Sequence, residues 1–314
     1  MMQTYSYHQD LPPVSRIAYG CMGMGGEWGE TPYTDAQKSD NFAAIDAALE
    51  AGITFFDHAD IYRSGKAEKV FGEYLAANPR VREQIVIQTK CGIRMGYYDF
   101  DPDYIIQSVE GSLGRLGIEQ IDCLLLHRPD LLAEPARIAS AFDQLHRSGK
   151  VKAFGVSNFT SAQIELLQAS VNQKLCANQI SLSLNHHHLI SDGVLSNTHQ
   201  SQWGNPLIDY CRLHEIRIQA YSCVGRGRLL VDRDDFTEDE ANARAYLQEL
   251  AEKYAVGLDA VLVAWLLRHP AGVQPILGTA KAARITTACR ADSVELTRPE
   301  WYGLLQNIRG KRVP

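Results

Sequence analysis

Short apolar segments and longer helical segments alternate along almost the whole chain. Eight of the short segments are rich in β-branched residues, as strands are. They span residues 16–19, 53–56, 85–88, 121–126, 153–156, 175–180, 216–220 and 273–277. Between most of them, apolar residues recur at the i, i+3 and i+4 spacing of an amphipathic helix. These helical segments include residues 36–52, 66–78, 102–117, 134–150, 161–171 and 243–255.

Strands that alternate with helices are typical of parallel sheets, and eight repeats predict an α/β chain folded as a (β/α)8 TIM barrel. Gly52, Gly117 and Gly149 stand where three of the helices are expected to end. A doubly wound sheet is the competing architecture, but it needs G-x-G-x-x-G after its first strand. Residues 20–26 read GCMGMGG, which lacks this spacing. No linker divides the chain, so a single domain over residues 1–314 is predicted.

The composition excludes several classes of function. The chain has 314 residues and a formal net charge of −6, with no long block of Lys or Arg, so a nucleic-acid partner is not expected. It has neither the run of about 18 apolar residues that a membrane helix needs nor a signal-peptide pattern at its start. The seven cysteines are scattered and include no C-x-x-C pair, which argues against a disulfide framework or a zinc site. These features predict a cytoplasmic protein without a membrane partner.

Polar side chains follow the apolar runs at the points where the strands are expected to end. Asp57, Lys90 and His127 come after the second, third and fourth runs, and Tyr62 lies in the same loop as Asp57. The carboxyl ends of barrel strands meet at one rim, where barrel enzymes build their active sites. Asp57 and Lys90 follow neighbouring strands, so we expect an ion pair that places a positive charge near Tyr62.

The chemistry of these four side chains favours reduction of a carbonyl group. A cation favours the ionised form of a nearby phenol, which makes Tyr62 a candidate general acid toward a developing alkoxide. His127 would give the same oxygen a second hydrogen bond. None of the four is an obvious nucleophile with its own base, which argues against acyl or phosphoryl transfer. The hydride has to come from a cofactor, because no side chain can supply it.

Seven motifs in order along the chain give it a family resemblance. They are FFDHADIYRSGKAEKVFGEYL, IQTKCG, LLLHRPD, FGVSNF, NQI, AYSCVGRG and PILGTAKAARI. Together they resemble the aldo-keto reductase family over almost the whole chain and, more narrowly, its bacterial YdhF-type subgroup. The resemblance implies that Asp57, Tyr62, Lys90 and His127 form the catalytic tetrad, with Tyr62 as the proton donor. It also implies NADP(H) as cofactor, bound in an extended form without a Rossmann unit.

The same resemblance assigns cofactor contacts to the second half of the chain. Ser157, Asn158 and Gln179 match the residues that hold the nicotinamide carboxamide, and Tyr221 matches the aromatic residue on which the ring stacks. The loop that folds over the pyrophosphate is implied to include Ser222, Val224, Gly225 and Gly227. The segment that meets the adenosine 2′-phosphate is implied to include Gly278, Thr279, Lys281 and Arg284, which favours NADP over NAD.

Four positions depart from the family pattern. Many members have a Lys where Gly278 stands and a Glu-Asn pair where Thr287 and Ala288 stand. At the adenosine end, Lys281 is a candidate to replace the missing cation. The usual glycine after the catalytic tyrosine is Arg63 here, on the substrate side of the site.

Two further sets of side chains could have a role in the site. Aromatic residues on the expected rim loops are candidates for an apolar substrate pocket: Trp28, Tyr97, Tyr98, Phe100 and Trp203. The run His186-His187-His188 contains an H-x-H spacing, but nothing else in the sequence completes a metal shell, so no metal is expected.

The leading hypothesis is an NADPH-dependent reductase of a small aldehyde or ketone. The alternative is a nicotinamide-binding regulatory or sensor subunit with little turnover, and a metal-dependent hydrolase ranks third. Binding of the cofactor without turnover would favour the regulatory subunit.

Overall fold

A closed barrel of eight parallel strands forms the centre of the molecule. The computed structural model describes residues 2–193 and 206–313. Around the barrel the strands follow one another in chain order, and the last pairs with the first. They are β3 (Ala18–Gly20), β4 (Phe55–Asp57), β5 (Val86–Cys91), β8 (Ile121–Leu126), β9 (Val151–Ser157), β10 (Leu175–Ser181), β11 (Arg217–Tyr221) and β12 (Gln274–Leu277). The predicted TIM barrel is therefore confirmed.

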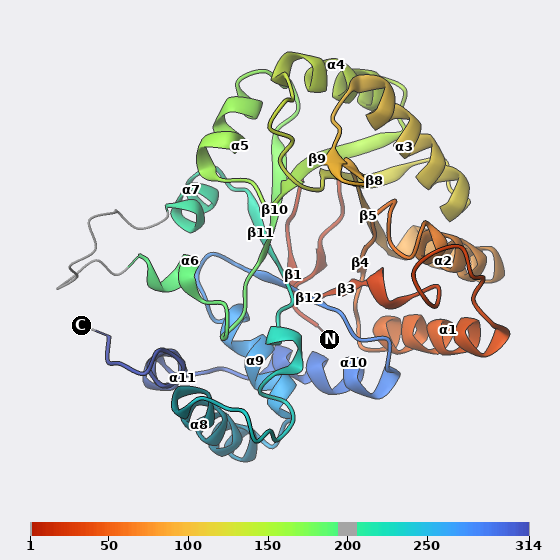
Figure 1. The fold of residues 1–314 in the computed structure, drawn as a ribbon. Helices are drawn as coiled ribbons and strands as arrows, with labels where there is room; N and C mark the ends of the chain where they lie inside the picture. Colours follow the sequence, from red (N-terminus) through yellow and green to blue (C-terminus); the bar gives the residue numbers. More distant parts are fainter. Residues whose placement is uncertain (1, 194–205, 314) are drawn as a thin grey trace.

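Helices surround the barrel (Figure 1), and α8 lies against α11 at one side of it. The α-helices of the described residues are α1 (Asp35–Glu50), α2 (Lys66–Ala77), α3 (Pro102–Leu116), α4 (Pro135–Arg147), α5 (Ser161–Gln168), α6 (His188–Ser191), α7 (Leu207–Leu213), α8 (Glu238–Tyr254), α9 (Leu258–Leu267), α10 (Ala282–Cys289) and α11 (Arg298–Arg309). Short 3₁₀ helices are η1 (Cys21–Gly23), η2 (Pro79–Gln84), η3 (Gly225–Gly227) and η4 (Arg290–Ser293). No helix in these ranges is long and apolar enough to span a bilayer.

The predicted strands are all present, but several end later than their apolar runs. The run 85–88 becomes a strand that continues to Cys91, and the run 153–156 becomes Val151–Ser157. The strands continue because polar side chains such as Lys90 point into a polar part of the barrel interior. Gly52, Gly117 and Gly149 follow α1, α3 and α4 with positive φ angles, as expected for residues that end helices.

Two short hairpins were not predicted from the sequence. β1 (Thr4–Tyr5) pairs with β2 (Val14–Ser15), and β6 (Ile93–Arg94) pairs with β7 (Tyr97–Tyr98). The first hairpin contributes Tyr7, Leu11 and Val14 to an apolar cluster inside the barrel. The other members of that cluster come from the barrel strands: Ala18, Phe55, Val86, Cys123, Leu125, Ala153, Cys176, Ala177 and Ile276. The N-terminal segment therefore closes the amino end of the barrel.

A polar layer lies inside the barrel next to this apolar cluster. Its members are the buried glutamines Gln88, Gln179, Gln219 and Gln274. The amide of Gln219 donates to Gln274 Oε1 at 3.1 Å and to the hydroxyl of Tyr7 at 2.7 Å. Gln274 in turn donates to the carbonyl of Ser15 at 2.9 Å. The barrel interior thus combines an apolar cluster with a hydrogen-bonded layer of amide groups.

His58 is buried directly after β4 and belongs to neither layer. Its ring packs edge-on against Phe71, with ring centroids 4.6 Å apart. Both ring nitrogens are buried without a hydrogen-bond partner in the described part of the chain. Burial, reinforced by the charge of Lys90, lowers the pKa of His58 to about 3. The folded protein therefore holds His58 neutral.

This burial makes stability depend on pH. The unfolded chain binds a proton at His58 below a pKa of about 6.5, whereas the folded chain does so only near 3. Stability is therefore lost as the pH falls below about 6.5. Between pH 7 and pH 5 we expect the wild type to lose about 2 kcal/mol more unfolding free energy than His58→Leu. Urea unfolding of both proteins at the two pH values measures this difference, and equal losses would contradict it.

Candidate active site

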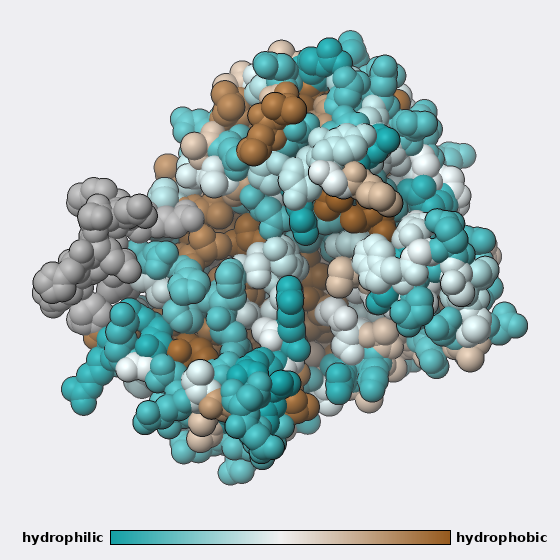
Figure 2. Space-filling model, viewed as in Figure 1, coloured by the Kyte–Doolittle hydropathy of each residue, from teal (hydrophilic) through white to brown (hydrophobic). Residues whose placement is uncertain are grey.

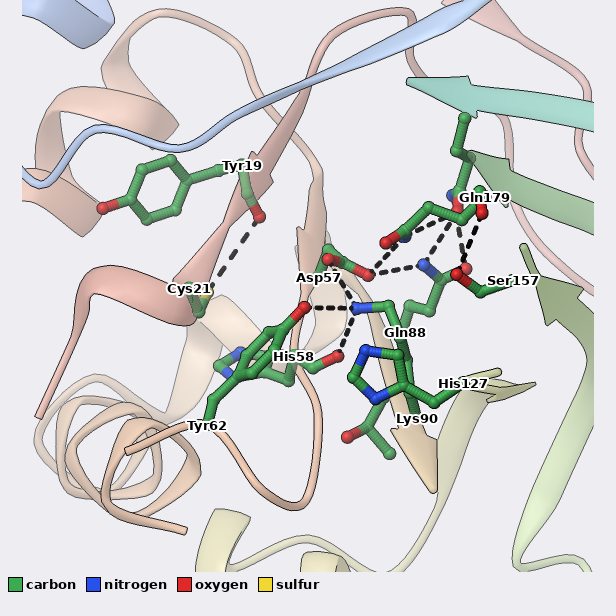
Figure 3. A network of polar contacts seen from close by, with 12 residues as sticks. Tyr19, Cys21, Asp57, His58, Tyr62, Gln88, Lys90, His127, Ser157 and Gln179 are labelled. Carbon is green, nitrogen blue, oxygen red and sulfur yellow. Dashed lines mark hydrogen bonds and ion pairs between the residues drawn. The ribbon is translucent and has the colours of Figure 1, made fainter. Parts of the chain in front are cut away.

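Lys90 joins three parts of the site from inside the barrel (Figure 3). Its ammonium group lies 2.8 Å from Asp57 Oδ2, 3.0 Å from the hydroxyl oxygen of Tyr62 and 2.7 Å from the carbonyl oxygen of His58. These three acceptors use all three ammonium donors. Because an ammonium group cannot accept, the Tyr62 oxygen is the acceptor in its bond. The proton of the Tyr62 hydroxyl is therefore free to point toward another acceptor.

Asp57 is held by amide groups on its other oxygen. Gln88 Nε2 donates to Asp57 Oδ1 at 2.6 Å, and Gln179 Nε2 donates to the same oxygen at 2.9 Å. Asp57, Gln88 and Gln179 are all buried. The carboxylate thus receives an ion pair and two hydrogen bonds, and hydrogen bonds of this kind stabilise a buried charge. Their direction fixes which oxygen faces Lys90.

The expected ion pair forms, but its effect on Tyr62 differs from the expectation. Burial raises the pKa of Tyr62, and the opposing effect of Lys90 does not overcome it. Burial alone would lower the pKa of Lys90, but Asp57 and Tyr62 together hold it above its usual value. The burial of Tyr62, which favours the neutral phenol, was not predicted from the sequence. Tyr62 therefore keeps its proton at neutral pH.

His127 follows β8 and faces Tyr62 across the site. The two rings meet edge-on, with centroids 5.9 Å apart and an interplanar angle of 80°. Burial, with added effects of Lys90 and Arg128, lowers the pKa of His127 to about 2. Its Nδ1 is buried and has no partner among the described residues. His127 is therefore a neutral imidazole, which carries one N–H donor.

The residues implied for nicotinamide binding form a connected group next to the tetrad. The Tyr221 hydroxyl donates to Asn158 Oδ1 at 2.9 Å, and Asn158 Nδ2 lies 3.0 Å from the Ser157 hydroxyl. Asn158 Nδ2 also donates to the carbonyl of His127 at 3.1 Å. Gln179 joins the same group through its backbone carbonyl, which accepts a hydrogen bond from the Ser157 hydroxyl at 2.9 Å. The structure therefore brings the predicted catalytic residues and these four together.

A cavity of about 600 Å³ joins segments that are far apart in sequence. Gly225, Gly227 and Arg284, all implied cofactor residues, line it. At Gly225, where φ is +58°, a Cβ would stand 2.6 Å from Asn185 Oδ1, so a side chain has no room there. Exposed backbone and guanidinium groups are suited to bind phosphate, so this cavity fits the phosphate-bearing end of a dinucleotide.

The remaining implied cofactor residues do not line this cavity. Ser222 has a positive φ of 54°, and Val224 packs against the core. Gly278 and Thr279 follow β12, and Lys281 is the exposed residue before α10.

Several residues of the site were not predicted from the sequence. The cavity is also lined by Arg226, Arg228, Arg233, Leu258 and Asp259. Gln88, which donates to Asp57, was not predicted either. It stands two residues before Lys90, and residues i and i+2 of a strand share a face. That spacing was a signal that Gln88 points into the barrel with the lysine.

The aromatic candidates on the rim divide into exposed and buried residues. Trp28 and Tyr97 are 52% and 55% exposed, and Tyr98 is partly exposed as well. Phe100 is instead a core residue, 3% exposed, because its ring packs against Gly92. Trp203 lies outside the described residues. In Figure 2 the hydrophobic residues of this face form several separate groups among hydrophilic ones.

The histidine run packs within itself. The rings of His187 and His188 have centroids 5.1 Å apart, and His187 Nδ1 lies 3.0 Å from the Ser191 hydroxyl. Within residues 2–193 and 206–313, no three His, Cys, Asp or Glu side chains gather as they do around a metal ion.

Comparison with known proteins places the chain in a family. The Aldo/keto reductase family model matches residues 16–304. Oxidoreductase YdhF of Escherichia coli (strain K12) is 38% identical over 86% of this chain and 88% of its own. A 6-dehydroglucose reductase of Agrobacterium fabrum is 36% identical over 97% of both chains. An aldo/keto reductase from Klebsiella pneumoniae, solved with NADP and acetate, has 24% identity and a TM-score of 0.75 over all of this chain and 97% of its own. The chain therefore belongs to the aldo/keto reductase family of oxidoreductases.

Proposed function

We propose that this protein is a cytoplasmic, NADPH-dependent reductase that converts an aldehyde or ketone to an alcohol. The observation that carries the proposal is the direction of one hydrogen bond. Tyr62 accepts from the buried Lys90 ammonium group, so its own proton is available to a substrate oxygen. A neutral phenol with its proton directed outward is a general acid.

The four side chains have separate tasks in this reaction. NADPH, when bound, supplies the hydride that the carbonyl carbon receives. Tyr62 gives its proton to the carbonyl oxygen and is left as a phenolate beside Lys90. The lysine charge stabilises that phenolate, and Asp57 holds the lysine in place. His127 donates a hydrogen bond to the same oxygen and, with a pKa of about 2, does not compete as an acid.

The preference for NADP rests on the guanidinium groups of the cavity. Arg226 and Arg284 line it, and neither is in an ion pair among the described residues. A guanidinium fork matches the geometry of a phosphate dianion. The resemblance places Arg284 at the adenosine 2′-phosphate, and the Klebsiella pneumoniae relative of the same fold was solved with NADP. Ser157, Asn158, Gln179 and Tyr221 would hold the nicotinamide beside Tyr62.

Removing the Tyr62 hydroxyl tests the assignment of the proton donor. In Tyr62→Phe we expect kcat for aldehyde reduction to fall by at least about 10³, because the general acid is lost. The affinity for NADPH, measured by tryptophan fluorescence, should change by less than threefold. Turnover close to that of the wild type would contradict the assignment. Binding of NADPH by the wild type without turnover of any aldehyde would favour the regulatory subunit.

Arg284→Gln tests the cofactor assignment. A charge-assisted bond to a phosphate contributes about 1.5–3 kcal/mol, so the Kd for NADPH should rise at least about 10-fold. The Kd for NADH should not change, because NADH has no 2′-phosphate. Arg290→Gln is the matched control, since Arg290 is exposed on η4 and does not line the cavity. Calorimetric titration measures all three proteins, and equal losses for NADPH and NADH would contradict the assignment.

A further inference from the structure

Two arginines stand directly after two of the proposed catalytic residues. Arg63 follows Tyr62, and Arg128 follows His127. Neither guanidinium group is in an ion pair with a carboxylate of residues 2–193 or 206–313. The chain as a whole has a net charge of −6, so the positive charge beside the site is opposite in sign to that of the protein.

Each guanidinium group is placed by one hydrogen bond and one aromatic ring. Arg63 Nε donates to the carbonyl of Met22 at 3.1 Å, and the guanidinium carbon lies 5.3 Å from the Trp28 ring. Arg128 Nη1 donates to the Tyr98 hydroxyl at 3.2 Å, with the guanidinium carbon 6.0 Å from that ring. Each side chain therefore keeps N–H donors that these contacts do not use.

The backbone at Arg63 gives an independent reason to assign it a function. Arg63 has a φ of 52°, in the left-handed region that glycine occupies at little cost. Ser64 and Gly65 follow with φ of 57° and 83°, so the strain extends along the loop that carries Tyr62. Residues held in such conformations cluster at active sites and ligand clamps. An arginine here costs stability that glycine would not, which indicates a use for its side chain.

Two other charged groups near these arginines have partners of their own. Arg94 pairs with Asp99 at 3.4 Å. Asp130, two residues after Arg128, accepts from the backbone N–H groups of Phe100 and Leu132 at 3.1 and 2.9 Å. The charge of Arg128 also reaches the catalytic group, because it contributes to the lowered pKa of His127. Arg63 and Arg128 are thus cations next to Tyr62 and His127 that have no carboxylate partner within the described residues.

We propose that the substrate is a carbonyl compound that also carries a carboxylate group, which Arg63 and Arg128 bind while Tyr62 and His127 hold the carbonyl oxygen. This inference rests on the proposed reductase function and adds the chemical class of its substrate. A planar guanidinium group binds a carboxylate through two parallel hydrogen bonds and is only weakly hydrated itself. The exposed faces of Trp28 and Tyr98 contact the apolar part of the same molecule.

A matched pair of aldehydes tests the proposal. With NADPH we compare 4-carboxybenzaldehyde with its methyl ester, which has the same shape near the aldehyde but no charge. We expect kcat/KM for the acid to exceed that for the ester at least about 10-fold at low salt. The ratio should fall in 0.5 M NaCl, because salt screens an exposed ion pair. It should also fall in Arg63→Gln and Arg128→Gln and approach one in the double variant.

Two controls separate substrate recognition from general effects. Arg147→Gln should keep the wild-type ratio, because Arg147 ends α4 and lines a cavity with Tyr7 at the amino end of the barrel. Arg63→Gly should lower the ratio without lowering the melting temperature, because glycine relieves the left-handed backbone. If the Arg63 side chain only supported the fold, Arg63→Gly would lower the melting temperature and leave the ratio unchanged.

The possible results are distinct. Equal kcat/KM values for the acid and the ester would overturn the carboxylate proposal and leave the reductase function standing. Absence of turnover with both aldehydes would overturn the reductase function, and the carboxylate proposal with it. A preference for the acid that survives in the double variant would overturn the assignment to Arg63 and Arg128.

Discussion

The ion pair between Asp57 and Lys90, buried at the carboxyl end of the barrel, is the interaction on which the site depends. Burying two charges costs several kcal/mol per ion unless hydrogen bonds satisfy them. Here every ammonium donor has an acceptor, and the far oxygen of Asp57 accepts from Gln88 and Gln179. One of the three acceptors of Lys90 is the Tyr62 hydroxyl. The geometry that compensates the buried charge therefore also sets the direction of the Tyr62 proton.

The interior of the barrel explains how this pair is held. Below it, Gln219 and Gln274 connect the strands by amide hydrogen bonds, and Tyr7 joins them from the N-terminal segment. Next to these lies the apolar cluster, to which Tyr7 also belongs. An interior that was apolar throughout would give the charges no partners, whereas the amide layer supplies them. The unusual polarity of the interior is thus a consequence of placing a charged lysine inside a closed barrel.

The fold was largely readable from the sequence because parallel barrel strands are buried on both faces and stand out as apolar runs. The same property misplaced some strand ends, since polar residues such as Lys90 point inward and the strand continues past the apolar run. The hairpin β1–β2 escaped prediction because strands of two residues have no measurable periodicity. Phe100 was a candidate for the substrate pocket, but its ring is buried against Gly92, and the local sequence does not reveal this contact.

The sequence predicted which residues form the candidate site but not the pKa values of their side chains. Asp57, Tyr62, Lys90 and His127 were found because strand ends meet at one rim. The sequence did not indicate how deeply Tyr62 is buried, and this burial reverses the expected shift of its pKa. Gln88 was overlooked although it shares a strand face with Lys90. The two-residue periodicity of strands is therefore a signal that can be applied to polar residues as well as apolar ones.

The most direct test removes both charges of the central pair at once. In the double variant Asp57→Asn with Lys90→Met neither charge is left unpaired, so the fold is expected to persist. The quantity to measure is the rate constant of hydride transfer in a single turnover with saturating NADPH. We predict a fall of at least about 10³, because the phenolate left on Tyr62 loses its counter-charge. A rate constant within threefold of the wild-type value, in a folded protein, would contradict the account.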